Sequence, residues 1–414
     1  MPVPSRRVYL DHAATTPVLD EVVEVVTRTM RQVGNASSLH THGRDARRLV
    51  EESRERVADA LRVRPSEVIF TSGGTESDNI AVKGTYAARV APAAPRAGIA
   101  DPPPRRDRLV ISGVEHHAVL DPVEHLVNTA GARVTWVEPD GDGLITPGAL
   151  EDALARDGGP QTVALVSVMW ANNEVGTVQP VPELAALARE HGIPFHSDAV
   201  QALGQVPLDL SVVDFGVVTG HKIGGPLGVG VLVAGRDQSP VPLTHGGGQE
   251  RQLRSGTLDT PGIAGLAVAV EHAVEHQASH ARHLALLRDA LIEGALALDD
   301  GISVSGPWTP GDVTRRLPGN VHLRVPDCEG DSLLYLLDAA GIACSTGSAC
   351  QSGVPRPSHV LLAMGIPEAD ARGALRMTLG HGSSAADVDA VLAALPPALE
   401  RARRAHAASS RSRS

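Results

Sequence analysis

A single lysine stands out among the residues of this 414-residue chain that could do chemistry. The sequence contains 37 Lys and Arg residues, of which only Lys83 and Lys222 are lysines. A guanidinium stays protonated and is a poor nucleophile, whereas an amine can lose its proton and condense with an aldehyde. Lys83 lies in the helical pattern ESDNIAVKGTYAAR and is interpreted as a surface residue. Lys222 follows an apolar run, in the segment GHKIGGPLG, and is the candidate for imine chemistry.

Two further segments could complete a site around Lys222. In FTSGGTESDNIAV an apolar run leads to Gly73, Gly74 and Thr75, and the helical pattern that follows leaves backbone N–H groups free for a phosphate. The segment is neither a GxGxxG nor a Walker sequence, which argues against dinucleotides and ATP. Asp198 ends the run IPFHSDAVQ, and a buried carboxylate there can keep a pyridine nitrogen protonated. Together these residues predict that Lys222 carries pyridoxal 5'-phosphate as a Schiff base. The alternatives are a strand-end cap for Asp198 and a glycine turn that binds nothing.

The elements that must position these residues follow an α/β pattern. Short apolar runs alternate with helical patterns from about residue 65 to 235, which indicates a mainly parallel sheet wrapped by helices. In such sheets the ligand lies at the carboxyl ends of the strands, where Lys222 and Asp198 are both expected. Residues 89–108 are rich in Pro, Ala and Arg without a period and are interpreted as an exposed insertion.

We expect two domains. A large domain that binds the cofactor covers residues 14–262. A smaller α+β domain is formed by residues 1–13 and 263–400, because helical patterns and one strand-like run dominate the second half of the chain. The last residues, 401–414, are expected to form a disordered tail.

Composition and charge exclude several other classes of protein. The net charge is -11 and basic residues are scattered, so nucleic-acid binding is not expected. No apolar run has the length of a membrane span or the form of a signal peptide, which predicts a cytoplasmic protein. Three cysteines are too few and too irregularly spaced for a disulfide framework or a CxxC metal site, so reduced thiols and no metal are expected.

Ten segments, in order from Tyr9 to about Gly380, resemble the cysteine desulfurases of the NifS/IscS type, which belong to the class V aminotransferases. The segments are YLDHAATTP, GNASSLH, TSGGTESDN, VEHHAV, ANNEVG, HSDAVQ, TGHKIGGPLG, HGGGQERQLRSGT, TGSAC and LRMTLG. The resemblance implies an α/β enzyme of fold type I that depends on pyridoxal 5'-phosphate. It also implies a large domain with a mainly parallel seven-stranded sheet, a smaller α+β domain, and a homodimer.

The resemblance further implies a role for individual residues. Lys222 would hold the cofactor and act as a base, Asp198 would pair with the pyridine nitrogen, and His116 would stack on the ring and carry protons. Gln201 would touch the ring hydroxyl. The residues implied to contact the phosphate or other parts of the cofactor are Gly74, Thr75, Asn173, Thr219 and His221, with Thr257 reaching in from a second subunit. Asn35 and Arg376, with Asn173, would bind the carboxylate of the substrate, since a bidentate arginine is the expected partner of a carboxylate.

Cys350 distinguishes the possible reactions. It lies in STGSACQSGVPRPSHV, which has no apolar periodicity and predicts an exposed mobile loop, whereas Cys328 and Cys344 are interpreted as buried. The resemblance implies that L-cysteine is converted to L-alanine while the thiolate of Cys350 takes the sulfur as a persulfide. The length of the loop matches the group with an extended sulfur-delivering loop, which implies transfer to an acceptor protein, either an iron–sulfur scaffold or a tRNA thiolase.

Two rival functions stay open at this point. A selenocysteine lyase or another class V aminotransferase would share the cofactor site without persulfide chemistry. A non-catalytic scaffold would retain only the fold.

Overall fold

A computed structural model describes residues 7–90, 105–347 and 357–413, with side chains described to residue 408. Most of the segment 89–108, which the sequence suggests is an insertion, therefore lies outside the described residues. None of the described helices combines the length and the hydropathy of a membrane span.

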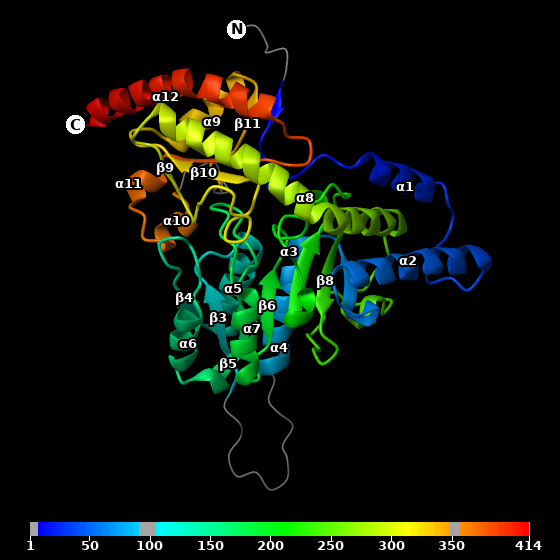
Figure 1. The fold of residues 1–414 in the computed structure, drawn as a ribbon. Coiled ribbons are helices and arrows are strands. Elements are labelled where there is room, and N and C mark those ends of the chain that lie inside the picture. The colour runs from blue at the N-terminus through cyan, green and yellow to red at the C-terminus, as the bar shows by residue number, and fades with distance from the viewer. Residues whose placement is uncertain (1–6, 91–104, 348–356, 414) are drawn as a thin grey trace.

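The described residues form a seven-stranded sheet at the centre of the larger part of the molecule (Figure 1). The strand order is β2-β8-β7-β6-β5-β3-β4, and β8 runs antiparallel to both of its neighbours while the other pairs are parallel. The strands are β2 (Val68–Thr71), β3 (Arg108–Ser112), β4 (Arg133–Val137), β5 (Val163–Ser167), β6 (Phe195–Asp198), β7 (Phe215–Thr219) and β8 (Gly230–Ala234). The predicted mainly parallel sheet of seven strands is confirmed.

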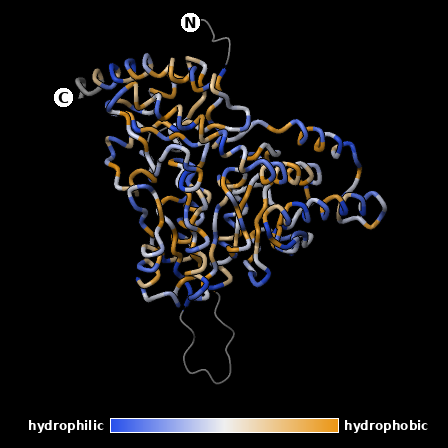
Figure 2. Tube along the Cα trace, in the orientation of Figure 1, coloured by the Kyte–Doolittle hydropathy of each residue, from blue (hydrophilic) through white to orange (hydrophobic). Residues whose placement is uncertain are grey.

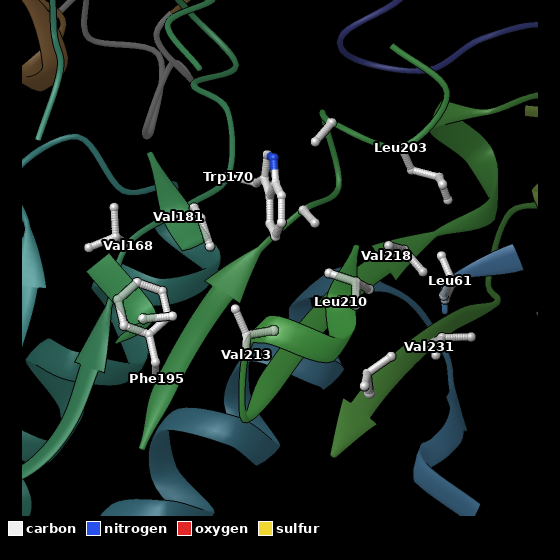
Figure 3. Packing of buried hydrophobic residues seen from close by; sticks show 14 of the residues in the cluster. Leu61, Val168, Trp170, Val181, Phe195, Leu203, Leu210, Val213, Val218 and Val231 are labelled. Carbon is white, nitrogen blue, oxygen red and sulfur yellow. The ribbon is translucent and has the colours of Figure 1, made fainter. Parts of the chain in front are cut away.

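The central strands are buried at every position, because helices cover both faces of the sheet. Strands β5, β7 and β8 are uniformly buried, which explains why they read as continuous apolar runs rather than as alternating patterns. Figure 3 shows buried side chains of the cluster on this sheet, among them Trp170, Phe195 and Val213.

Two groups of helices cover the sheet. On one face lie α2 (Thr41–Ala60), α6 (Pro147–Ala155), α7 (Val181–Glu190) and the first half of α8 (Thr260–Leu298). On the other face lie α3 (Gly74–Asn79), a π-helical turn (Ile80–Gly84), α4 (Thr85–Val90) and α5 (His117–Ala130). Helix α1 (Asp20–Met30) packs on α8. The described fold is therefore a three-layer α/β arrangement.

A second hydrophobic cluster forms the smaller part of the molecule. Helices α9 (Gly330–Ala339) and α12 (Ala385–Arg413) and the second half of α8 pack on a three-stranded antiparallel sheet. The sheet consists of β9 (Ser303–Val304), β10 (Asn320–Arg324) and β12 (Ala374–Thr378). Strand β1 (Val8–Tyr9) pairs with β11 (Ile342–Ala343), and the short helices α10 (His359–Ala363) and α11 (Glu368–Ala371) precede β12.

Helix α8 joins the two hydrophobic clusters. Ile263 and Leu266 belong to the cluster of the large sheet, whereas Leu287 and Leu291 belong to the smaller one. Figure 1 shows this helix running from the large sheet toward α12. It passes through the predicted boundary at residue 262 without a break, and the exact limits of the two domains stay a prediction.

The predicted disordered tail from residue 401 is wrong for the described residues, because α12 continues to Arg413. Ala398, Leu399 and Ala402 are buried against the smaller cluster, and Arg403 pairs with Asp299 at the end of α8. Hydrophobic and hydrophilic positions alternate along this helix in Figure 2. Residues 401–413 contain no Gly or Pro, and alanine and arginine favour helix strongly. This polar segment can therefore continue α12 once one face of the helix is packed.

Candidate active site

A cavity of about 440 Å³ lies at the carboxyl ends of the central strands. This is where ligands bind in open α/β sheets. Ten residues singled out in the sequence line it: Gly74, Thr75, His116, Asn173, Asp198, Gln201, Thr219, His221, Lys222 and Arg376.

Lys222 ends a 3-10 turn (Gly220–Lys222) that directly follows β7. Its Nζ donates hydrogen bonds to the backbone carbonyls of Ala13 and Ala14, the second at 2.7 Å. Burial, and next the nearby guanidinium of Arg376, lower the pKa of Lys222 to about 8, against smaller opposing effects of the carboxylates of Asp198 and Asp11. A substantial share of the amine is therefore unprotonated near neutral pH, which is the form that attacks an aldehyde.

Asp198 ends β6, which lies next to β7, so its carboxylate and Lys222 face the same cavity. Its Oδ1 accepts a hydrogen bond of 2.9 Å from the backbone of Val200. Burial raises the pKa of Asp198, opposed by that hydrogen bond and by the charges of His196 and Lys222. A carboxylate held in this way can receive a hydrogen bond from a protonated ring nitrogen.

Behind Asp198 lies a polar network that sequence reasoning did not identify. Asp78 is fully buried, and burial together with the charge of Asp198 raises its pKa well above the ordinary value. Nε2 of His196 lies 3.1 Å from Asp78 Oδ1, and Nδ1 of His196 lies 2.8 Å from the hydroxyl of Ser167. No spacing in the sequence brings residues 78, 167 and 196 together, because they come from separate elements.

Glu115 is a second buried acid that the sequence did not single out. Its Oε1 accepts hydrogen bonds from Ser112 Oγ at 2.7 Å and from the backbone of Met169 at 2.6 Å. Burial raises the pKa of Glu115 to about 7, against the lowering effect of these hydrogen bonds. In the segment VEHHAV, Glu115 directly precedes His116, and this neighbour was the one signal in the sequence that could have identified Glu115 as a site residue.

His116 begins helix α5 as its N-cap, and its Nδ1 accepts a hydrogen bond of 3.1 Å from the backbone of Ala118. Burial, followed by the charge of Lys222, lowers the pKa of His116 to about 4. The ring is neutral at physiological pH and borders the cavity, so it can stack on a flat ligand and accept a proton.

The turn before helix α3 also borders the cavity, and it offers hydrogen-bond donors for an anion. Gly73 precedes helix α3 with φ +146, and the first N–H groups of a helix lack partners within the helix. Thr219 lies across from this turn, since a Cβ added to Gly73 would lie 3.7 Å from its hydroxyl. Nδ1 of His221 lies 3.4 Å from the hydroxyl of Thr15.

Arg376 lies on β12 and reaches the cavity from the three-stranded sheet of the smaller part of the molecule. Its Nη1 donates to the backbone carbonyl of Asn173, and its Nη2 donates to Asp11 Oδ1, both at 2.9 Å. The carboxylate of Asp11 is therefore already paired with the guanidinium that the sequence suggests as the partner of a substrate carboxylate. Nε2 of Gln201 donates to the carbonyl of Ala13 at 3.0 Å, which is the same carbonyl that Lys222 contacts.

Two described residues named in the sequence, Asn35 and Thr257, are not among the residues that line this cavity. Asn35 is exposed in the loop between α1 and α2, where its Oδ1 accepts a hydrogen bond from the backbone of Ser37 at 2.9 Å. Thr257 is exposed before α8. Cys350 lies outside the described residues. The assignment of roles to all the predicted site residues stays a prediction.

The two described cysteines are poor nucleophiles. Burial raises the pKa of Cys328 to about 12 and that of Cys344 to about 12. A thiol reacts as the thiolate, so little of either is reactive near neutral pH. Among the described residues, no three His, Cys, Asp or Glu side chains lie close enough together to hold a metal ion.

Comparison with known proteins identifies the family. The model of the class V aminotransferases matches residues 8–391, so the chain belongs to that family. The chain is 54% identical over 399 residues to an IscS-like cysteine desulfurase of Mycobacterium tuberculosis, covering 96% of this chain and 97% of that one. It is 40% identical to a cysteine desulfurase IscS of Methanosarcina thermophila, over 96% of this chain and 93% of the other.

Solved structures show the same likeness. A NifS-like protein superposes with a TM-score of 0.82 at 35% identity, over 96% of this chain and 99% of the other. A structure described as SspA in complex with cysteine superposes with a TM-score of 0.74 at 32% identity, over 90% of this chain and 99% of that chain.

Proposed function

We propose that this chain is a cysteine desulfurase that converts L-cysteine to L-alanine and takes the sulfur on Cys350 as a persulfide. The observation that carries the proposal is the convergence of Lys222, Asp198 and Arg376 on one cavity. Relatives that match nearly the full length of the chain are named cysteine desulfurases, which supports the choice of reaction.

Pyridoxal 5'-phosphate is the cofactor of this family, and the cavity fits it. When bound, it supplies an electron sink for charge that develops at the α-carbon of the substrate. Lys222 and Asp198 lie at the ends of neighbouring strands, where one can hold an aldehyde and the other a ring nitrogen. The turn before α3, with Thr75 and Thr219, suits the phosphate group.

Arg376 is proposed to bind the substrate carboxylate. The residue is 5% exposed, and its Nε is buried without a hydrogen-bond partner among the described residues. An incoming carboxylate can replace Asp11 as the partner and also satisfy the remaining donors, since guanidinium binds carboxylates in bidentate fashion. The amide of Asn173, which lines the cavity beside Arg376, is proposed as a second contact.

Lys222 and His116 are proposed to move protons. The lowered pKa of Lys222 leaves an unprotonated amine that can accept a proton at Nζ. His116 is neutral and borders the same cavity, so its ring can accept a proton and return it.

Cys350 is proposed as the sulfur acceptor. Its thiolate would form an S–S bond with the substrate sulfur as the C–S bond breaks, and the carbon fragment takes up a proton and leaves as alanine. Cys328 and Cys344 are the other thiols of the chain, and their raised pKa values argue against either one as the nucleophile.

A homodimer is proposed from the residues that a single chain leaves exposed. Thr257 is exposed and is not among the described residues that line the cavity, which supports a role for it in a neighbouring subunit's site. The persulfide sulfur is proposed to pass to an acceptor protein, either an iron–sulfur scaffold or a tRNA thiolase. The relatives named IscS support this choice.

The test is a pair of cysteine variants assayed for alanine formation from L-cysteine with a reductant present. Cys350→Ala should lose alanine formation while keeping its bound cofactor and its absorbance. Cys344→Ala is the matched control and should keep both. Full alanine formation by Cys350→Ala would refute persulfide chemistry at Cys350 and favour a lyase.

A further inference from the structure

Asp78 connects two elements that border the candidate active site. It lies on α3 four residues after Gly74, on the same face of the helix, and both residues line the cavity. Oδ1 of Asp78 lies 3.1 Å from Nε2 of His196. His196 lies on β6 two residues before Asp198, so the two side chains point to the same face of the strand. The contact between Asp78 and His196 therefore ties the helix of the proposed phosphate site to the strand that ends at Asp198.

The surroundings of Asp78 disfavour its charged form. The residue is fully buried, and its Oδ2 has no hydrogen-bond partner among the described residues. Burial, and next the charge of Asp198, raise the pKa of Asp78 well above the ordinary value. Burial also lowers the pKa of His196, so this ring is neutral near pH 7.5 and offers no positive charge. Asp78 therefore keeps its proton near neutral pH.

Asp198 is the member of the pair that ionises. Its Oδ1 accepts a hydrogen bond of 2.9 Å from the backbone of Val200. Burial raises the pKa of Asp198, but this hydrogen bond and the charge of Lys222 oppose the rise. The carboxyl of Asp78, by contrast, hydrogen-bonds only His196 among the described residues. Two acids in one buried site do not both ionise easily, and the acid with a backbone donor and a nearby cation takes the charge.

The chain of contacts behind Asp78 needs no charged member. Nδ1 of His196 lies 2.8 Å from the hydroxyl of Ser167, which can donate or accept a hydrogen bond. A neutral His196 carries one hydrogen, and a protonated Asp78 can also donate or accept. Both ring nitrogens are therefore satisfied whichever of them carries the hydrogen. The contact that fixes Asp78 is compatible with an uncharged acid.

We propose that Asp78 is a positioning residue for the cofactor: as an uncharged acid held by His196, it ties α3 to β6 without adding a second negative charge to the cavity. A charged Asp78 would repel a phosphate held at Gly74 and Thr75, which line the same cavity. The inference rests on the proposed binding of pyridoxal 5'-phosphate, but it does not depend on the reaction at Cys350.

Infrared spectroscopy of the holoenzyme at pH 7.5 tests the protonation of Asp78. A protonated carboxyl has a C=O stretch that an ionised carboxylate lacks, so wild type should show such a band and Asp78→Asn should lose it. Glu115 is present in both proteins, and its contribution cancels in the difference spectrum. Asp152→Asn is the matched control, because Asp152 is exposed on helix α6, and it should lose no such band.

The affinity of the full-length apoprotein for pyridoxine 5'-phosphate tests the positioning role. This probe lacks the aldehyde and therefore forms no bond with Lys222. Asp78→Asn keeps an uncharged partner for His196, so its affinity should stay within about threefold of wild type. Asp78→Leu breaks the tie between α3 and β6 and should weaken binding at least ~10-fold, because the buried ring of His196 loses its partner. Circular dichroism checks that each variant is folded.

Three results would overturn the proposal. One is a wild-type spectrum without a band that Asp78→Asn removes, since Asp78 would then be ionised. Another is a change of about tenfold or more in the affinity of Asp78→Asn, because removing a true charge beside a bound phosphate has an effect of that size. The third is equal affinity of wild type and Asp78→Leu. Both measurements are made without L-cysteine, so their failure is distinct from a failure of alanine formation or of persulfide chemistry at Cys350.

Discussion

Replacing Arg376 by glutamine should raise the pKa of Lys222 and slow the attachment of the cofactor. The pKa of Lys222 is about 8, with burial as the main cause and the charge of Arg376 as the next. Glutamine removes the guanidinium charge. It also leaves Asp11 without its cationic partner, and the charge of Asp11 raises the pKa of Lys222 as well. Both consequences act in the same direction.

The size of the effect follows from the fraction of unprotonated amine. With a pKa of about 8, roughly a quarter of the amine is unprotonated at pH 7.5, compared with roughly 0.1% for an ordinary lysine. The amine of the wild type is therefore roughly 200-fold more available than that of an ordinary lysine. Burial remains in the variant, so its pKa should lie between about 8 and the ordinary lysine value. Each unit of increase lowers the attachment rate at pH 7.5 by about tenfold.

The assay mixes apoprotein with pyridoxal 5'-phosphate and follows the bound-cofactor absorbance by stopped flow from pH 6 to pH 10. The rate of the wild type should rise with pH to a midpoint near 8, as set by the pKa of Lys222, and Arg376→Gln should move the midpoint upward. Arg372→Gln is the matched control, because Arg372 pairs with Glu368 on the surface. An unchanged midpoint in Arg376→Gln, or a wild-type midpoint near that of free lysine, would refute the reasoning.

Three further predictions concern buried acids and one hydroxyl. The raised pKa of Glu115, about 7, means that the folded protein binds this proton more tightly than the unfolded chain, so its contribution to stability is lost as pH rises through 7. Between pH 4.5 and pH 8 the wild type should therefore lose about 3 kcal/mol of its free energy of unfolding that Glu115→Gln does not lose. The measurement is urea titration of both apoproteins at the two pH values. Asp198→Asn should lower the rate of alanine formation at least ~100-fold at saturating cysteine, because a preorganised charge at the reacting group is lost; a loss below tenfold would contradict its role. Ser358 Oγ donates to Glu174 at 2.5 Å, and Ser358→Ala should lower the melting temperature by roughly 3 °C, measured by calorimetry, because a buried acceptor loses its partner; an unchanged melting temperature would contradict it.

Periodicity and strand-end chemistry predicted the centre of the fold. The apolar runs of the sequence correspond to strands such as β5 and β7, which are buried on both faces and therefore carry a strong signal. Lys222 and Asp198 follow from the same argument, since parallel strands present their carboxyl ends at one edge.

Contacts between distant segments could not be predicted in this way. Asp11 pairs with Arg376 across 365 positions of sequence, and Asp78 meets His196 across 118. Such contacts depend on how whole elements pack, which no local pattern specifies. The fate of the C-terminal residues was also misjudged, because the burial of Ala402 against the smaller cluster is a tertiary effect.

The most direct test of the proposed function is to map sulfur after a single turnover. The holoenzyme is incubated with L-cysteine without a reductant, alanine is quantified, and persulfides are located by mass spectrometry of alkylated peptides. The account predicts one alanine per active site and a persulfide on the peptide that contains Cys350. A persulfide on Cys328 or Cys344, or alanine formed without any persulfide, would contradict it.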